Sequence, residues 1–359
     1  MTPRDPIDSG RSGPDPVVLA VATASPPHRL SQCDLRAFAR RMFADDFAEL
    51  DQLLTIFDNT GIHERQLACP MEWYEAPRPF AEKNEVYRAA ALELATRAAS
   101  EALARAGLAP ADIGAIVFVS SSGIATPSLD SALIPALDLP RNVARAPLWG
   151  LGCAGGASGL ARAAELVRAR GAPVLLVAVE ICSVTFVHSD RSKSNLVATS
   201  LFGDGAAAAV LACEGEGPRL LASHSQLLDD TQDVMGWTLT DDGLRVRFAR
   251  SIPSIVSAML PQFCADAAAA AGIEPAAIEH LVLHPGGAKV LAAYEDELQV
   301  PRARLQTAWD VLRDHGNMSS PTLLFVLERF LQTTPTTRAP GLAVALGPGF
   351  SAEGMIFRW

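Results

Sequence analysis

The stretch 107–121, GLAPADIGAIVFVSS, and the stretch 272–286, GIEPAAIEHLVLHPG, carry the same pattern at two places in the chain. In each, a helix ends near Gly, a Pro-started turn follows, and an apolar strand emerges into a polar or Gly-rich loop. Each stretch therefore predicts one helix–turn–strand unit. Because the unit occurs twice, the sequence predicts an internal repeat.

The similarity extends outward on both sides of the two copies. An Ala-rich helix precedes each of them, YRAAALELATRAASEALARAG in the first and PSIVSAMLPQFCADAAAAAG in the second. Both halves also close alike, since 201–213 and 345–359 each run from a G-x-G turn into an apolar strand. Helices that alternate with short apolar strands are typical of an α/β protein with strands buried on both faces.

This pattern divides the chain into three parts. We expect a flexible tail over 1–16, one α/β half over 17–216 and a second, related half over 217–359, with the boundary near 215–219. The tail holds Pro, Gly, Ser and charge but no apolar run of the kind found in signal peptides. A site shared between the two packed halves is a natural place for a ligand.

Composition excludes several classes of protein. With 359 residues, 49% of them hydrophobic, the chain can bury a large core, and its net charge of -10 argues against non-specific nucleic-acid binding. The longest apolar stretches, such as APVLLVAVEIC, are too short to span a membrane. Six scattered cysteines without CxxC pairs indicate neither a zinc site nor a disulfide framework. We expect reduced thiols in a cytoplasmic enzyme.

Cys153 is the candidate nucleophile. It lies in WGLGCAGGASGLARAAELVRAR, where small residues surround it and an amphipathic helix starts just after it. A cysteine on a tight turn at a helix N-terminus is expected to have a lowered pKa and thiolate character. The alternative role is a small buried hydrophobe. We expect that role for four other cysteines, which lack this context: Cys33, Cys69, Cys213 and Cys264.

His284 and Asn317 are the candidate partners. His284 ends the apolar strand HLVLH and opens a Gly-rich loop, and Asn317 lies in HGNMSSPTLLFVLERF ahead of an apolar helix. Each also has a structural alternative, a satisfied histidine and a turn or helix-capping asparagine, and His315 competes as a base. Papain-like proteases have Cys, His and Asn in this order, but Cys153 lacks their CGSCW-like signature and the duplicated α/β plan does not fit them.

Five motifs together resemble one family. GLGCAGG, LFGDGAA, HPGG, GNMSS and GPGFSAE occur in the order found in type III polyketide synthases, the chalcone and stilbene synthase family with its bacterial relatives. The resemblance covers 17–359 and implies the duplicated thiolase fold, with αβαβα layers. A β-ketoacyl-ACP synthase III would typically show HQAN in place of HPGG. A degradative thiolase would carry a second catalytic cysteine late in the chain, and no cysteine follows Cys264.

The resemblance implies an acyltransferase that extends a starter acyl-CoA with malonyl-CoA. Cys153 would be acylated, while His284 and Asn317 would hold the thioester carbonyl and the enolate formed by decarboxylation. The product would be a pyrone or resorcinol-type ring, with no metal or organic cofactor. Two alternatives stay open, a β-ketoacyl-ACP synthase III-like enzyme and a ketosynthase-like enzyme that joins two β-ketoacyl chains into an α-pyrone. The acyl donors would be CoA or carrier-protein thioesters.

The resemblance also implies substrate-binding residues. They are the gatekeeper aromatic Phe202, the cavity-lining Cys182 and Thr185, Thr126, and the GPGF residues Gly347, Pro348, Gly349 and Phe350. Thr126 matches a position that reaches the partner subunit's cavity, which implies a homodimer. Small side chains at such positions resemble bacterial members that take long fatty acyl starters. Thr55 and Asn59 stand where plant members carry bases for the CoA phosphates, and Arg65 is a candidate replacement.

Overall fold

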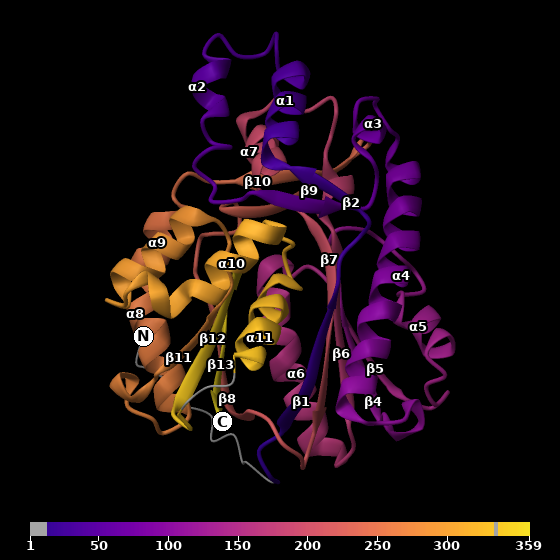
Figure 1. Ribbon diagram of the computed structural model, residues 1–359, viewed down its shortest axis with the longest axis vertical. Helices are drawn as coiled ribbons and strands as arrows, with labels where there is room; N and C mark the ends of the chain where they lie inside the picture. The colour runs from indigo at the N-terminus through magenta and orange to yellow at the C-terminus, as the bar shows by residue number, and fades with distance from the viewer. Residues whose placement is uncertain (1–12, 334–336) are drawn as a thin grey trace.

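A nine-stranded mixed sheet runs through the molecule, with the strand order β11-β12-β13-β8-β1-β7-β6-β4-β5 (Figure 1). The computed structural model describes residues 13–333 and 337–359, so most of the predicted tail over 1–16 lies outside the described residues. The strands of the sheet are β1 (Val17–Ala24), β4 (Ala115–Val119), β5 (Ala144–Leu148), β6 (Val174–Ile181), β7 (Asp204–Ala212), β8 (Arg219–Leu227), β11 (His280–Leu283), β12 (Pro340–Gly347) and β13 (Ser351–Arg358).

The two halves of the sheet repeat one strand plan. In the first half, β4 is parallel to β6, and β6, β7 and β1 then follow antiparallel. In the second half, β11 is parallel to β12, and β12, β13 and β8 follow antiparallel. The pair Val17 and Arg219 joins β1 to β8 and so connects the halves. The duplicated α/β fold predicted from the sequence repeat is confirmed.

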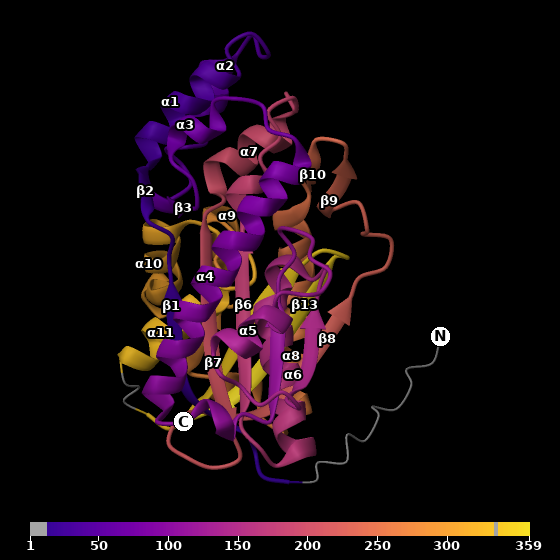
Figure 2. The same cartoon turned by 90° about the vertical axis from the view of Figure 1, so that its right-hand side faces the viewer.

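The large helices form three layers around the strands (Figures 1 and 2). Helices α6 and α11 lie in the middle, where each contacts strands of both halves, while α4 covers β1, β6 and β7 and α8 covers β8 and β13. This is the predicted αβαβα order. The helices of the layers are α4 (Phe80–Ala106), α5 (Asp130–Ala136), α6 (Gly155–Arg170), α8 (Ile252–Ala270), α9 (Ala288–Glu297), α10 (Gln306–His315) and α11 (Thr322–Gln332).

The middle position of α6 explains its composition. Its first five residues, GGASG, are all buried. Bulky side chains there would push α6 away from β4 and β6, because a Cβ on Gly155 would meet Val119 at 2.6 Å and a Cβ on Gly159 would meet Leu176 at 2.7 Å. Small residues therefore let the cysteine-bearing end of α6 reach the centre of the molecule.

A group of smaller elements sits over one end of the sheet, at the top of Figure 1. These elements are β2 (His28–Ser31), β3 (Glu64–Leu67), β9 (Met235–Thr240), β10 (Gly243–Phe248), α1 (Gln32–Met42), α2 (Leu50–Leu54), α3 (Met71–Tyr74) and α7 (Lys193–Leu201). Five short 3-10 helices complete the structure: η1 (Pro110–Asp112), η2 (Gly152–Ala154), η3 (Cys182–Thr185), η4 (Pro275–Ala277) and η5 (Arg302–Leu305). Helices η1 and η4 are the two Pro-started turns of the repeat.

In the part of the chain that the structure describes, none of the helices combines the length and hydrophobicity that a membrane crossing requires. All six cysteines lie in that part, and all are free thiols.

Candidate active site

Cys153 lies in η2, the single turn that precedes α6, and only 8% of its surface is exposed. The predicted tight turn at a helix start is confirmed. Gly152 adopts φ +47°, and a Cβ there would meet the Pro348 ring at 2.8 Å. Gly347 is equally confined, because its Cβ would meet Ala154 at 2.5 Å. The GPGF loop, predicted as a substrate-binding segment, thus packs directly against the cysteine turn.

Asn317 connects three parts of the site. Its Nδ2 lies 3.8 Å from the Cys153 Sγ and donates to the Gly286 carbonyl at 3.2 Å. Its Oδ1 accepts from the Ser319 N–H at 2.7 Å, which fixes the orientation of the amide. Residues 164 positions apart in the chain therefore meet, and the HPGG loop is held beside them.

His284 follows β11 and donates its backbone N–H to the Val344 carbonyl at 2.9 Å. Its ring is buried, and neither ring nitrogen has a hydrogen-bond partner among the described residues. Buried polar atoms are normally satisfied, so two free nitrogens indicate a group that acts on something else. Both ring nitrogens of His315, the competing base, already have partners. Its Nδ1 lies 2.7 Å from the Gln66 side-chain oxygen, and its Nε2 lies 3.2 Å from Arg329.

The protonation of the two candidates differs from the sequence-based expectation. Burial raises the pKa of the Cys153 thiol to about 11, although hydrogen bonds with Ser319 and Asn317 act in the opposite direction. Burial also lowers the pKa of the His284 imidazole to about 3. The expectation of a lowered cysteine pKa is wrong, because loss of hydration outweighs the helix N-terminus at this depth. Burial thus favours the neutral form of both the thiol and the imidazole.

Phe202, at the C-terminal end of α7, pairs as an isolated bridge with Asn317. Aromatic side chains that the sequence analysis missed surround it: Trp237 lies 5.9 Å and Phe248 5.6 Å away, measured between ring centroids. Both come from the hairpin of β9 and β10. A DDG turn between two apolar strands is the signal from which this hairpin could have been found.

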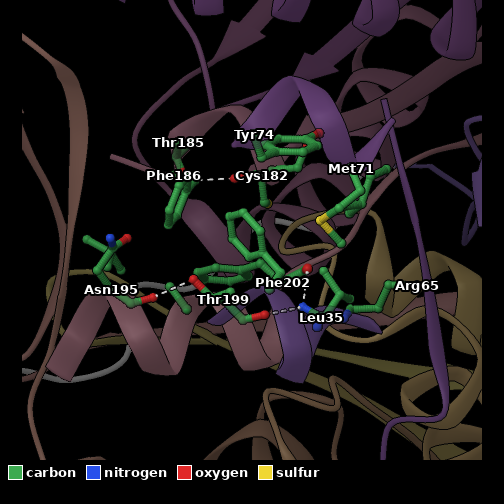
Figure 3. A pocket seen from close by; sticks show the side chains of 15 residues that line it. Leu35, Arg65, Met71, Tyr74, Cys182, Thr185, Phe186, Asn195, Thr199 and Phe202 are labelled. Carbon is green, nitrogen blue, oxygen red and sulfur yellow. Dashed lines mark hydrogen bonds between the residues drawn. The ribbon is translucent and has the colours of Figure 1, made fainter. Parts of the chain in front are cut away.

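A cavity of about 50 Å³ lies next to Phe202, under α1 and α3 (Figure 3). Cys182 and Thr185, both predicted to line a cavity, are among its wall residues. The Thr185 hydroxyl donates to the Cys182 carbonyl at 2.7 Å, so it is already satisfied. Most of the remaining wall is apolar and includes Leu35, Phe38, Leu67, Met71, Phe186 and Val246.

Glu180 is a third residue that the sequence analysis missed. It is fully buried on β6, where its carboxylate accepts from the Ser121 and Ser122 N–H groups and from the Ser320 hydroxyl, at 2.7 to 3.0 Å. Burial raises the pKa of this carboxyl to about 7 in spite of these donors. The single acid in the apolar run VLLVAVEIC could have marked Glu180 as a residue with a special role, because burying an isolated charge costs free energy.

Arg65 lies on the wall of the same cavity as Phe202, Cys182 and Thr185. Arg65 is 1% exposed, and its guanidinium donates to the Thr199 and Phe202 carbonyls, each at 2.8 Å. The expectation that Arg65 binds CoA phosphate is therefore wrong, because the guanidinium is buried and both of its Nη groups donate inside the protein. Thr126 is exposed on the loop after β4.

Comparisons with known proteins agree with this geometry. The sequence profile of the N-terminal domain of chalcone and stilbene synthases matches residues 8–215, and the profile of their C-terminal domain matches 219–359. A candidate chalcone synthase of Bacillus subtilis (strain 168) is 40% identical, over 95% of this chain and 98% of its own. The 1,3,6,8-tetrahydroxynaphthalene synthase of Streptomyces peucetius subsp. caesius is 38% identical, over 98% and 94%.

Among solved structures, the 1,3,6,8-tetrahydroxynaphthalene synthase of Streptomyces coelicolor A3(2), a bacterial type III polyketide synthase, superposes with a TM-score of 0.92. It is 28% identical, and the match covers 96% of this chain and 99% of that one. Profiles that match almost the whole chain, relatives at 38 to 40% identity and a shared layered fold agree with one another. The chain therefore belongs to the chalcone and stilbene synthase family and is a type III polyketide synthase, an enzyme of the acyltransferase class.

Proposed function

We propose that Cys153 carries the growing polyketide and that Asn317 and His284 stabilise the charge that develops during decarboxylation of malonyl-CoA. The observation that supports this most strongly is the position of the Asn317 amide, 3.8 Å from the Cys153 Sγ and bonded to the loop of His284. Family membership gives the reaction class. The roles of these three residues are the proposal.

The first step is acyl transfer to the cysteine. His284, neutral and with free ring nitrogens, accepts the thiol proton as the Cys153 sulfur attacks the starter thioester. The carbonyl becomes a tetrahedral oxyanion, which collapses with loss of the CoA thiolate. The CoA thiolate takes the proton back from His284 and leaves as the free thiol.

The second step is decarboxylation and condensation. Malonyl-CoA loses carbon dioxide, and the electron pair of the broken C–C bond becomes an enolate whose oxygen faces the donors of Asn317 and His284. Fixed donors in a site that excludes water stabilise such an oxyanion by several kcal/mol. The enolate carbon then attacks the Cys153 thioester, and the Cys153 sulfur leaves as a thiolate that takes up a proton from solvent. The chain, two carbons longer, is now on CoA and returns to Cys153 by the same acyl transfer for the next extension. The steps use acyl-CoA and malonyl-CoA and call on no metal or organic cofactor.

The starter in this proposal is a medium or long fatty acyl-CoA, and the product is an alkylpyrone or alkylresorcinol. Support comes from the small side chains of Cys182 and Thr185 on the wall of the cavity beside Phe202, and from the apolar character of the rest of that wall. Each methylene that enters an apolar site contributes about 0.8 kcal/mol. Preference should therefore rise with chain length until the cavity, about 50 Å³ before any wall residue moves, is full.

The working form in this proposal is a cytoplasmic homodimer. Trp149 is 63% and Ile124 39% exposed, and the Trp149 ring N–H donates to the Gly123 carbonyl at 3.1 Å, so both apolar side chains lie on adjoining loops near Thr126. A second copy that covers this surface would remove it from water and bring Thr126 near the partner's cavity.

Product analysis tests this function. The enzyme is incubated with labelled malonyl-CoA and, separately, with acetyl-, hexanoyl-, dodecanoyl- or coumaroyl-CoA, or with the corresponding carrier-protein thioesters, and products are identified by mass spectrometry. We expect labelled alkylpyrones or alkylresorcinols with the longer acyl-CoA starters. Preference for acetyl or coumaroyl starters, or a tetrahydroxynaphthalene product, would exclude the fatty-acyl starter. Pyrones formed when β-ketoacyl thioesters are supplied without malonyl-CoA would indicate the ketosynthase-like reaction.

A further inference from the structure

Arg65 is a buried cation that no step of the proposed reaction uses. It lies on β3, and only 1% of its surface is exposed. Its Nη1 donates to the Thr199 and Phe202 carbonyls and its Nη2 to the Gln32 side-chain oxygen, all at 2.8 Å. Figure 3 shows the guanidinium beneath Phe202, pointing at these carbonyls. Burying a charge this deeply costs free energy, so the groups that Arg65 binds indicate its role.

Arg65 belongs to a complete set of donors at the C-terminal end of α7. The last carbonyls of a helix have no partner within the helix. Here Arg65 takes those of Thr199 and Phe202, and the Gln32 amide takes that of Ser200 at 2.9 Å. The carbonyl of Leu201 accepts from the backbone N–H of Asn317 at 3.0 Å.

The same helix end therefore positions Asn317. Its N–H bonds to the Leu201 carbonyl and its carbonyl accepts from the Gly203 N–H, both at 3.0 Å. The side chain of Arg65 also fills the space under this contact, because a Cβ on Gly316 would meet the Arg65 Cδ at 2.7 Å. The Asn317 amide, one residue further, is the group placed against the Cys153 sulfur.

We propose that Arg65 is a positioning residue for the decarboxylation step, which it serves by fixing the 201–203 backbone that holds Asn317. This inference rests on the proposed function for the role of Asn317. Arg65 touches no reacting atom, and Cys153 is held by its own turn on α6. Loss of Arg65 should therefore impair the step that depends on the Asn317 amide and spare the acylation of Cys153.

The test compares two rates in Arg65→Met, Arg65→Lys and Gln32→Leu: carbon dioxide release from malonyl-CoA, and Cys153 acylation by dodecanoyl-CoA followed by intact mass. We expect carbon dioxide release to fall about 10- to 100-fold in Arg65→Met, less in Arg65→Lys, and acylation to stay within about twofold. Should Arg65→Met fail to fold, the other two variants give the same comparison. Arg168→Met is the matched control, since Arg168 also donates to backbone carbonyls, those of Leu220 and Leu221, but at the far end of α6.

A double variant separates positioning from general destabilisation. If Arg65 acts through Asn317, then Arg65→Met/Asn317→Ala should release carbon dioxide no more slowly than Asn317→Ala alone. Equal losses of acylation and decarboxylation in the folded variants, or unchanged decarboxylation, would overturn the proposal.

Hydrogen exchange gives a readout that does not depend on the activity. Mass spectrometry should show faster exchange of the Gly203 and Asn317 amides in Arg65→Lys than in the natural protein, and unchanged exchange would contradict the proposal. If the natural protein released no carbon dioxide from malonyl-CoA, the proposed function would fail, while the exchange result would still decide whether Arg65 holds this backbone.

Discussion

At the scale of single residues, the Asn317 side-chain amide can present one group, its Nδ2, to a substrate. Its Oδ1 is taken by the Ser319 N–H, and its Nδ2 lies between the Gly286 carbonyl and the Cys153 sulfur. An N–H group held in this way needs no reorganisation when an oxyanion forms beside it. Such a donor contributes chiefly to the step that develops negative charge on oxygen.

Asn317→Ala should therefore slow carbon dioxide release from malonyl-CoA about 100- to 1000-fold, the range of a lost oxyanion donor, while Cys153 is still acylated. Radiolabelled carbon dioxide and intact mass measure the two steps on the same sample. Asn59→Ala is a suitable control, because the exposed Asn59 side chain bonds only to the local Thr55 carbonyl. Unchanged carbon dioxide release would remove Asn317 from the site.

Glu180 makes stability depend on pH. Burial raises the pKa of this carboxyl from 4.5 to about 7, so between these values the folded state binds a proton that the unfolded state has lost. This contribution to stability is complete below pH 4.5 and is lost as the pH rises through 7. Relative to Glu180→Gln, the natural protein should lose about 3 kcal/mol of unfolding free energy between pH 4.5 and pH 8. Denaturant unfolding at several pH values measures this, and a pH-independent difference would contradict the assignment.

At the scale of elements, α6 packs closely against the loop after Asn317 because a glycine lies at the contact. A Cβ on Gly156 would meet the Ser320 carbonyl oxygen at 2.4 Å, so the helix and the loop touch backbone to backbone. The helix that follows Cys153 and the loop that carries Asn317 are in this way held at a fixed separation.

Gly156→Ala should therefore lower stability by about 1 to 3 kcal/mol, since overpacking outweighs the better helix propensity of alanine. It should also slow carbon dioxide release, because Ser320 and with it Asn317 must move. Thermal unfolding and the decarboxylation assay measure both effects. Glu165→Ala, at an exposed position of the same helix, is the control. Equal stability and equal carbon dioxide release in the two variants would show that the close contact between Gly156 and Ser320 does not matter.

The sequence predicted those elements best that repeat or that carry a local motif. The two helix–turn–strand units, the cysteine turn before α6 and the strand that ends at His284 follow from patterns within about fifteen residues. The aromatic surroundings of Phe202 did not, because Trp237 and Phe248 reach it through tertiary packing. The partners of Arg65 could not be predicted from the sequence either, because its guanidinium donates to carbonyls more than 130 positions away in the chain.

The pKa of Cys153 also depends on tertiary structure that the sequence does not show. The helix start next to it was visible in the sequence, but the depth of burial was not, and burial determines the direction of the shift.

At the scale of the whole molecule, the duplication brings the proposed catalytic residues of both halves to a common centre. Cys153 comes from the first half and His284 and Asn317 from the second, and the middle layer of α6 and α11 brings them together. The division into 17–216 and 217–359 stays a prediction. Neither half alone holds the complete set of residues.

The exposed apolar surface near Thr126 belongs to this scale too. If a second copy covers Trp149 and Ile124, then Trp149→Glu would bury an unpaired carboxylate in the dimer and should shift the protein to monomers. Light scattering after size-exclusion chromatography measures the mass directly. Trp359→Glu, at the last residue of the chain, is a comparison that should leave the mass unchanged. A natural protein that runs as a monomer would refute the homodimer.

The central claim is that Cys153 is the residue that carries the acyl chain, and peptide mass spectrometry after incubation with dodecanoyl-CoA tests it most directly. We predict one dodecanoyl group per chain, located on the peptide that contains Cys153, and none in Cys153→Ala. An acyl group on Cys182 or another cysteine, or full labelling of Cys153→Ala, would contradict the account.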